Sequence, residues 1–245
     1  MAPSEQPTRV RRVRGGPSRC PTPITTVSTA VNEIRRGRIV VVLDAPDRKN
    51  EGYLTLAADF VTPEAINFMA RSGLISLCLT DERCEVLGLR RLGHEGPSQY
   101  RKNFTVSIDA RHGITTGISA RDRARSIEIA ADPARGRDDL VSPGHMFALR
   151  AFPGGLLDRP GHTEASIELA RLAGLTPAAV VAEVMRADGT LARLPDLASY
   201  CSRHHIKLVT VEAIVEYLDR EVCATSTRLD PFAPSHRTVG ATAWD

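Results

Sequence analysis

The chain has 245 residues, of which 42% are hydrophobic and 25% charged, and its formal net charge is +3. These values are typical of a globular protein, and so small a net charge gives no indication of nucleic-acid binding. No apolar run approaches the roughly 18 residues of a membrane span, and the first residues lack the apolar core of a signal peptide. We therefore expect a cytoplasmic protein that acts without a membrane or a nucleic acid.

Both ends of the chain differ in composition from its middle. Residues 1–23 hold five prolines and five arginines, which predicts a disordered basic arm. Whether this arm is only solvated or contacts an anionic partner stays open. Residues 223–245 are rich in Pro, Ser and Thr and are expected to form a loose tail. A single domain at 24–222 remains between them.

Apolar periodicity, helix caps and glycines predict alternating helices and strands. The elements expected in the first half are a helix capped by Thr25 or Thr26 and ending near Gly37, a strand at 39–43, a charged turn at 44–53, a helix from Thr62 to Gly73, a strand at 74–79 and a short helix opened by Thr80. Those expected in the second half are a loop at 90–103, a strand at 104–108, a turn at 113–117, a helix capped by Ser119, a strand at 146–151, a helix at 162–174, a strand at 179–185, a helix capped by Asp196, a strand at 207–210 and a last helix ending near Arg220. Alternation without repeats predicts one α/β domain.

The five cysteines predict reduced thiols in an intracellular protein. Their number is odd and no pair has CxxC spacing, which favours neither a disulfide framework nor a zinc site. They are Cys20, Cys78, Cys84, Cys201 and Cys223.

Three groups of polar side chains are candidates for a functional site. They are the turn with Arg48, Lys49, Glu51 and Tyr53; the segment with Arg159, His162, Thr163 and Glu164; and Glu183 within an apolar strand, with His145 as a further candidate. A charged turn after a buried strand is where α/β folds often bind ligands, although an ordinary solvated turn has the same composition.

The second group has the character of a phosphate site. Thr163 at a helix N-terminus next to Arg159 would bring backbone N–H groups, the helix dipole and a guanidinium to one anion. Arg48 and the hydroxyls of Thr115 and Thr116 could complete it. Glu183 needs a partner or a proton, because burying an isolated charge is costly. Capping by His162 and a salt bridge from Glu183 are the structural alternatives, so the residues alone predict an α/β enzyme with a small anionic substrate.

A series of motifs, taken together, resembles the 3,4-dihydroxy-2-butanone 4-phosphate synthase family of the riboflavin pathway. In chain order they are DRKNEG, VTPEAINFMAR, FTVSIDARHGITTGISARDRA, DLVSPGHMFALRA, GGLLDRPGHTEASIELARLAGL and DGTLARLPDL, within residues 26–218. The resemblance implies a mixed sheet with surrounding helices and a homodimer with active sites at the subunit interface. It also implies cleavage of ribulose 5-phosphate to formate and a four-carbon ketone phosphate, through an enediol, dehydration, a skeletal shift and loss of C4.

The resemblance assigns roles to individual residues. Arg48 matches a substrate or phosphate arginine, Arg159 and Thr163 match phosphate contacts, and His162 matches a ligand of the family's Mg²⁺ or Mn²⁺. His145 and Glu183 match two residues that the family needs for activity. In the family such an ion holds the substrate's oxygens as a Lewis acid.

Two positions depart from the family's usual DRENEGD turn, which reads DRKNEGY here. Lys49 replaces a metal-ligating Glu, and Tyr53 replaces an acidic residue assigned to acid–base work. A cation cannot ligate Mg²⁺, so the sequence favours metal-independent chemistry, in which Lys49 stabilises an enediolate or forms a Schiff base and Tyr53 acts with a lowered pKa. The alternative is that Lys49 points to solvent and Tyr53 only packs on the loop.

Three functions follow. The leading hypothesis is a divergent lyase of this family, acting on a pentulose phosphate with altered chemistry in a specialised pathway. The second is an authentic 3,4-dihydroxy-2-butanone 4-phosphate synthase, and the third is a catalytically silent paralogue that binds sugar phosphate.

Overall fold

The computed structural model describes residues 24–44, 51–92 and 103–229, and the other residues lie outside the description. The described strands are β1 (Val40–Leu43), β2 (Gly52–Ala57), β3 (Ile75–Leu79), β4 (Ile108–Ala110), β5 (Leu140–Arg150), β6 (Ala178–Glu183) and β7 (Lys207–Thr210). The α-helices are α1 (Val27–Arg35), α2 (Pro63–Ala70), α3 (Asp81–Val86), α4 (Ala120–Ala131), α5 (Gly155–Asp158), α6 (His162–Leu172), α7 (Leu194–His204) and α8 (Val211–Leu229), with 3₁₀ turns at η2 (Ala58–Phe60) and η4 (Arg137–Asp139).

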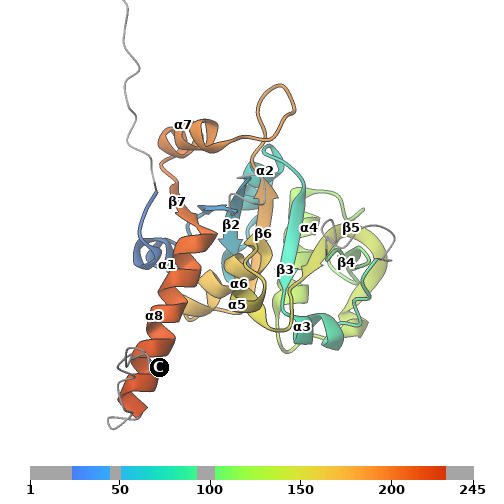
Figure 1. The fold of residues 1–245 in the computed structure, drawn as a ribbon. Helices are drawn as coiled ribbons and strands as arrows, with labels where there is room; N and C mark the ends of the chain where they lie inside the picture. Colours follow the sequence, from blue (N-terminus) through green and yellow to red (C-terminus); the bar gives the residue numbers. More distant parts are fainter. Residues whose placement is uncertain (1–23, 45–50, 93–102, 230–245) are drawn as a thin grey trace, which may run out of the picture.

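In the described part of the chain the strands form one seven-stranded sheet in the order β4-β5-β3-β6-β2-β1-β7 (Figure 1). β1 pairs with β7 and β3 with β5 in parallel, and the other neighbours are antiparallel. The predicted α/β fold with a mixed sheet and surrounding helices is therefore confirmed.

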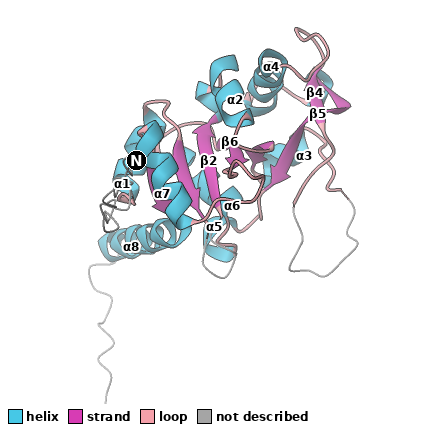
Figure 2. Cartoon of the chain, turned by 90° about the horizontal axis from the view of Figure 1, so that it is seen from above, coloured by secondary structure: helices cyan, strands magenta, loops and turns pink. Residues whose placement is uncertain are grey.

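Helices cover both faces of this sheet, as the view from above shows (Figure 2). Strand β1 illustrates why, because its side chains alternate between the faces. Val41 and Leu43 join the larger core cluster with residues of α2, α4 and α7, whereas Val40 and Val42 join a second cluster with α1 and α6. A strand that is apolar at every position is thus buried on both sides, which agrees with its continuous apolar sequence.

The sequence predicted that threonine and serine hydroxyls cap the N-termini of four helices, and these helix starts are confirmed. The side chains of Thr26, Thr62, Thr80 and Ser119 each accept a hydrogen bond from a backbone N–H in the first turn of the helix that follows. Each cap satisfies a donor that the helix itself leaves unpaired.

Several predicted boundaries are wrong. Strand β2 was missed altogether, since its sequence follows the charged turn without a break. The strand expected at 104–108 begins only at Ile108 and runs to Ala110 as β4. Strand β5 begins at Leu140 and not at Met146, because Leu140 and Val141 pair with Ala110 and Asp109 of β4. Asp196 accepts a bond from Arg193 N–H as the third residue of α7, whose N-cap is Arg193. Helix α8 continues past Arg220 to Leu229.

Cys78, Cys84 and Cys201 are buried free thiols, and the reduced state of the five cysteines stays a prediction. Within the parts of the chain that the structure describes, no helix is both long and apolar enough to cross a membrane. The predicted domain limits and cytoplasmic location stay predictions. Residues 1–23 and 230–245, which hold the basic arm and most of the tail, lie outside the described residues.

Candidate active site

The candidate site lies where β1 ends, β2 begins and β6 ends. β1 and β2 are antiparallel neighbours, and Asp44 N–H donates to the carbonyl of Glu51 just beyond their last pair. Tyr53 on β2 stands opposite Glu183 on β6. Directly opposed residues project their side chains to the same face of a sheet, so Tyr53 and Glu183 share a face. On that face Thr55, two residues after Tyr53, contacts Ser166 of α6.

Tyr53 is buried against His162. The two rings are stacked, with centroids 3.7 Å apart and planes inclined by 8°. The phenol hydroxyl donates to the Glu51 carboxylate over 3.1 Å. Burial, followed by the charges of Glu51, Glu183 and Asp44, raises the pKa of Tyr53 far above its ordinary value. This is opposite to the lowered pKa expected from the sequence; Lys49, on which that expectation depended, lies outside the described residues.

His162 is the first residue of α6, and Asp44 lies beside it. The Nδ1 atom of His162 is 3.3 Å from Oδ2 of Asp44, whose side chain is buried. The strand end and the helix start are therefore joined by an imidazole–carboxylate pair. Asp44 was seen in the sequence only as one acid of the charged turn, because its contact with α6 spans 118 residues.

Arg159 pairs with a buried carboxylate. Its Nη1 atom lies 2.8 and 2.9 Å from the two oxygens of Glu164, whose side chain is fully enclosed. Glu164 also accepts a bond from the backbone N–H of Phe152. The guanidinium, which is 27% exposed, is thus held at the start of α6 by a residue of the same helix.

Thr163 is buried and faces a thiol that the sequence analysis did not single out. Its side chain is near enough to Cys78 of β3 to lower the pKa of that thiol, although other effects are larger. Burial and the charge of Glu164 raise the pKa of Cys78 well above its ordinary value. The prediction that Thr163 stands at a helix N-terminus near Arg159 is confirmed by the geometry; its hydroxyl, however, is already in contact with the sheet.

His145 belongs to a second cluster, at the β4 end of the sheet. Its Nδ1 atom lies 2.8 Å from Oδ2 of Asp109 on β4. In the turn that follows β4, the Thr115 hydroxyl donates to Asp122, and this bond is the main reason that the pKa of Asp122 is lowered. Thr116, in the same turn, is exposed.

The predicted site residues therefore fall into two clusters within one chain. The first contains Tyr53, Glu183, Arg159, His162 and Thr163, and the second contains His145, Thr115 and Thr116. β3 lies between the strands of His145 and Glu183, so their strands are about 10 Å apart. Within the described residues no hydrogen bond or ion pair joins the two clusters. Arg48 and Lys49 lie outside those residues.

The described side chains do not fit a magnesium site by themselves. Magnesium prefers several oxygen ligands in near-octahedral geometry. His162 is paired with Asp44 and covered by the Tyr53 ring. Among the described residues, no group of three or more His, Cys, Asp or Glu side chains is placed to hold a metal ion.

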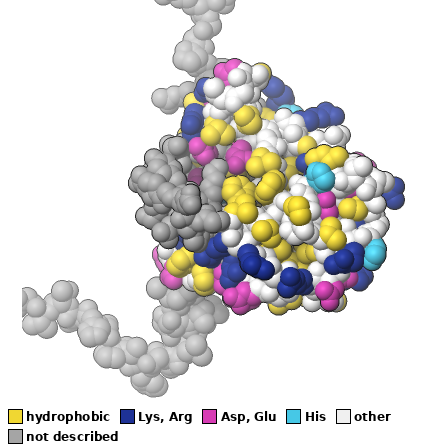
Figure 3. Space-filling view, turned by 90° about the vertical axis from the view of Figure 1, so that its right-hand side faces the viewer, with side chains coloured by type: hydrophobic (Ala, Val, Ile, Leu, Met, Phe, Trp, Pro, Cys, Tyr) yellow, Lys and Arg dark blue, Asp and Glu magenta, His cyan; other side chains and the backbone are white. Residues whose placement is uncertain are grey.

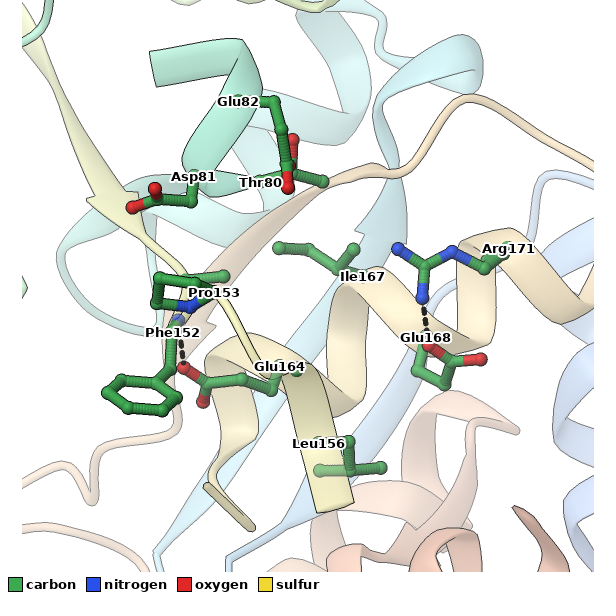
Figure 4. Close-up of a pocket in the computed structure, with 12 residues that line it drawn as sticks. Thr80, Asp81, Glu82, Phe152, Pro153, Leu156, Glu164, Ile167, Glu168 and Arg171 are labelled. Atoms are coloured by element: carbon green, nitrogen blue, oxygen red, sulfur yellow. Dashed lines mark hydrogen bonds and ion pairs between the residues drawn. The ribbon is translucent and has the colours of Figure 1, made fainter. Parts of the chain in front are cut away.

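A small cavity lies behind Glu164, between α3, α6 and the end of β5 (Figure 4). Its volume is about 60 Å³, and its walls include Asp81, Glu82, Glu164 and Glu168. Figure 4 shows Glu164 bonded to the backbone of Phe152 and Glu168 bonded to Arg171. The cavity is too small for a sugar phosphate, since small-molecule sites usually exceed about 300 Å³, and it is acidic.

Comparisons with known proteins agree with the resemblance seen in the sequence. Residues 28–217 match the sequence model of the family described as 3,4-dihydroxy-2-butanone 4-phosphate synthase. The riboflavin biosynthesis protein RibBA of Aquifex aeolicus is 53% identical over 196 residues, covering 78% of this chain and 48% of RibBA. The 3,4-dihydroxy-2-butanone 4-phosphate synthase of Neisseria meningitidis serogroup A is 48% identical over 199 residues, covering 80% of this chain and 55% of that protein.

Solved structures agree as well. RibBX of A. baumannii, a two-domain 3,4-dihydroxy-2-butanone 4-phosphate synthase, superposes with a TM-score of 0.76 at 43% identity, covering 79% of this chain and 57% of that one. A 3,4-dihydroxy-2-butanone 4-phosphate synthase in complex with two magnesium ions gives a TM-score of 0.76 at 36% identity, covering 80% of this chain and 98% of that one. The chain spans about half the length of the curated relatives that it matches.

Proposed function

Because the chain belongs to the 3,4-dihydroxy-2-butanone 4-phosphate synthase family, we propose that it cleaves ribulose 5-phosphate to formate and 3,4-dihydroxy-2-butanone 4-phosphate in riboflavin biosynthesis. The observation that carries this proposal is the family match over residues 28–217, which contains every candidate site residue. Since the chain spans about half of its curated relatives, the proposal concerns the reaction of this domain.

The leading hypothesis from the sequence, a divergent enzyme with altered chemistry, is less well supported than its alternative. Relatives named as synthases or as riboflavin biosynthesis proteins are about half identical to this chain over nearly 200 residues. The substitutions at Lys49 and Tyr53 stand within an otherwise closely similar domain. The authentic synthase reaction is therefore the first function to test.

The start of α6 is the proposed seat of the substrate's phosphate. α6 is 11 residues long, and the N–H groups of its first turn favour an anion. Arg159 stands at the same end with part of its guanidinium exposed. Its bond to Glu164 fixes its position, so it can hold a phosphate oxygen without first ordering a mobile side chain.

Proton transfer is the proposed task of the acidic and imidazole groups beside this seat. A ketose enolises when a base removes a proton next to its carbonyl, and dehydration then needs an acid for the leaving hydroxyl. His162, paired with Asp44, and Glu183, opposite Tyr53, are candidates for these roles. The Tyr53 hydroxyl stays protonated because its pKa is raised, so it serves as a hydrogen-bond donor and not as a base.

We further propose a homodimer with active sites at its subunit interface. The side of the molecule that carries α3, α4, β4 and β5 gathers apolar side chains, with Lys and Arg along one border (Figure 3). Exposed large apolar residues of these elements and of the segments next to them are Val86, Leu92, Ile118, Val141 and Phe152. His145, whose side chain is 43% exposed, lies on β5. A second copy placed against this side would bury the apolar residues and bring His145 to an interface.

Altered chemistry on the same class of substrate is the second candidate. The observation that favours it is the stacking of Tyr53 on His162, together with a lysine at position 49. In this reading Lys49 stabilises the enediolate or forms a Schiff base, and no divalent ion takes part. The double variant Lys49→Glu with Tyr53→Asp should then make activity depend on Mg²⁺; if it gains no metal binding, this reading loses its support.

The test is incubation with ribulose 5-phosphate, in the presence of Mg²⁺ or of a chelator, with formate and phosphorylated products measured. Formate that appears with Mg²⁺ and not with chelator supports the synthase. A different phosphorylated product that is insensitive to chelator supports altered chemistry. An increase in melting temperature with ribulose 5-phosphate but no turnover would instead indicate a sugar-phosphate-binding paralogue.

A further inference from the structure

The chain enters the described structure beside the start of α8. Ile24 pairs with Leu208 of β7 in parallel orientation, and the N–H of Thr25 donates to the Leu208 carbonyl over 2.7 Å. β7 is the last strand at one edge of the described sheet, and α8 follows it directly at Val211. Residues 1–23 are therefore attached to the domain at a point next to α8.

The exposed side of α8 carries a row of carboxylates. Glu212, Glu216 and Asp219 are spaced by four and three residues, which places them on one face of the helix. All three are exposed, and within the described part of the chain no hydrogen bond or ion pair engages their carboxylates. Like charges at this spacing repel one another, so cations that neutralise the row would stabilise the helix.

A groove between α8 and the start of α1 borders this acidic row. α1 and α8 lie next to each other (Figure 1), and the groove between them has a volume of about 440 Å³. Arg220 on its wall lies one helical turn beyond Glu216, and its Nε donates to the Glu216 carbonyl over 3.0 Å. The groove is lined by Thr26, Val27 and Ser28 from α1 and its cap, and by Ala213, Tyr217, Arg220 and Glu221 from α8. It therefore offers apolar side chains and an aromatic ring directly beside the carboxylates.

Residues 1–23 have the complementary composition. They contain five arginines and one acid, Glu5, whereas residues 211–221 of α8 contain four acids and one arginine. Val10 and Val13 stand among the arginines and suit the apolar part of the groove. The arginines are Arg9, Arg11, Arg12, Arg14 and Arg19. Because they belong to the same chain as α8, even weak pairs form at a high effective concentration.

The length of this segment is sufficient to cover the row. Glu212 and Asp219 are separated by about 10 Å along the helix axis. Arg19 is five residues from Ile24, a span of at most about 18 Å, and Arg9 is ten residues further away. The arginines can therefore reach every carboxylate of the row without any change in the described structure.

We propose that residues 9–19 of this chain dock on the groove and the acidic row of α8, with arginines paired to Glu212, Glu216 and Asp219. The occupant is the chain's own segment, because its point of attachment adjoins the groove and its charge is opposite to that of the row. Docking occupies the arginines, so the segment does not hold an outside anion such as a nucleic acid. The inference is independent of the proposed reaction.

The test uses the full-length protein and its own cysteines. Cys20 adjoins the docked segment, and Cys223 is one helical turn beyond Asp219 in α8. The other three cysteines are buried with raised pKa values and should not react at pH 7. A short bismaleimide should therefore link Cys20 to Cys223 within one chain, as detected by peptide mass spectrometry and by the mass of the intact chain. In 1 M NaCl, where the Debye length is about 3 Å, the rate should fall by about fivefold or more.

Neutralising the row tests the charge pairing. The triple variant Glu212→Gln, Glu216→Gln, Asp219→Asn should keep its fold, because these side chains are exposed. Its rate of cross-linking should be about tenfold lower than that of the wild type. Trypsin should also cut at the arginines of residues 9–19 about tenfold faster in this variant, since docked sites are protected.

Two controls match these measurements. Glu64→Gln, Glu82→Gln, Asp138→Asn removes the same number of exposed carboxylates from other elements, and it should keep the rate within about twofold. Cys223→Ser with Ala134→Cys moves the second thiol to an exposed position just beyond α4. α4 and α8 lie on opposite sides of the molecule (Figure 2), so this variant should give no link to Cys20.

Three results would overturn the proposal. Equal cross-linking in the two triple variants, or a rate that 1 M NaCl leaves unchanged, would contradict the charge pairing. A link that joins two chains would place the segment on a second copy. Protection from trypsin that appears only when a short DNA or RNA duplex is added would assign the arginines to a nucleic acid.

Discussion

The phenol ring of Tyr53 lies flat on the imidazole of His162, 3.7 Å between centroids, while its hydroxyl donates to Glu51. The ring thereby covers one face of the histidine that begins α6, and the hydroxyl engages one of the acids at the start of β2. The side chain of Tyr53 is buried, and its pKa is raised. Tyr53 therefore covers one face of the His162 ring and acts as a hydrogen-bond donor.

The first prediction concerns the ionisation of Tyr53. Because burial and neighbouring carboxylates raise its pKa, the hydroxyl should stay protonated when ordinary tyrosines ionise near pH 10. The difference in absorbance at 295 nm between the wild type and Tyr53→Phe should show no phenolate below about pH 11. A tyrosinate signal near pH 9 would mean that a cation lowers the pKa, as the sequence-based hypothesis required.

The same shift predicts how stability changes with pH. In the unfolded chain Tyr53 ionises near pH 10 and in the folded chain it does not, so its contribution is complete below pH 10 and is lost as the pH rises further. Above pH 10 the free energy of unfolding should therefore fall by about 1.4 kcal/mol per pH unit more in the wild type than in Tyr53→Phe, which amounts to about 1.4 kcal/mol in all between pH 9 and pH 11. Urea unfolding at pH 9 and 11 measures this, and equal slopes would contradict it.

A second prediction separates two roles of Arg159. Arg159→Gln leaves the enclosed carboxylate of Glu164 with only the Phe152 N–H, which should cost about 2–4 kcal/mol of unfolding free energy. The double variant with Glu164→Gln should recover most of this loss. If Arg159 also binds the phosphate, both variants should raise the KM for ribulose 5-phosphate by about tenfold or more.

Arg171→Gln is the control for this pair of variants, since Arg171 bonds to Glu168 on the same helix and its side chain is 58% exposed. It should change stability by less than about 1 kcal/mol and leave KM unchanged. If the double variant Arg159→Gln with Glu164→Gln keeps the wild-type KM, Arg159 serves only to neutralise the buried charge of Glu164.

The third prediction uses two glycines with similar backbones. Gly117 and Gly189 have φ values of 92° and 83°, but only a Cβ on Gly117 meets neighbouring atoms. Gly189→Ala should cost about 1 kcal/mol from backbone strain alone. Gly117→Ala should cost more and also reduce kcat, because the new methyl group displaces the Asp109–His145 contact. Equal changes of the free energy of unfolding and of kcat in the two variants would refute this prediction.

A fourth prediction concerns the thiols. Burial raises the pKa of Cys84 to about 12 and that of Cys201 to about 11, and raises that of Cys78 well above its ordinary value. Since thiolates are the reactive form, these three cysteines should resist alkylation at pH 8 until the protein unfolds. Peptide mass spectrometry before and after urea treatment measures this; rapid labelling of Cys78 in the native protein would show that β3 opens.

Much of the fold could be predicted from local patterns. Hydroxyl caps such as Thr62 and Ser119 and the apolar run of β1 are local signals, because their partners are a few residues away. β2 was missed because Tyr53 and Thr55 are polar residues that are buried against α6, which no local period reveals. Asp196 is of a residue type that often caps helices, but it is the third residue of α7. There its carboxylate accepts a hydrogen bond from the backbone N–H of Arg193.

The site was only partly predictable for the same reason. His162 and Arg159 stand close together in the sequence, so their shared position at the start of α6 could be inferred. The contacts of His162 with Asp44 and of His145 with Asp109 span 118 and 36 residues and depend on strand order. The sequence also placed Thr115 with the phosphate group, whereas its hydroxyl donates to Asp122.

The most direct measurement of the central claim is the fate of C4 of ribulose 5-phosphate. Incubation of the protein with substrate carrying ¹³C at C4, in the presence of Mg²⁺, should release the label as formate in a one-to-one ratio with a four-carbon ketone phosphate, and the product should feed riboflavin synthesis. Retention of the label in a five-carbon phosphate, or no change in the substrate, would contradict the proposed 3,4-dihydroxy-2-butanone 4-phosphate synthase reaction of this domain.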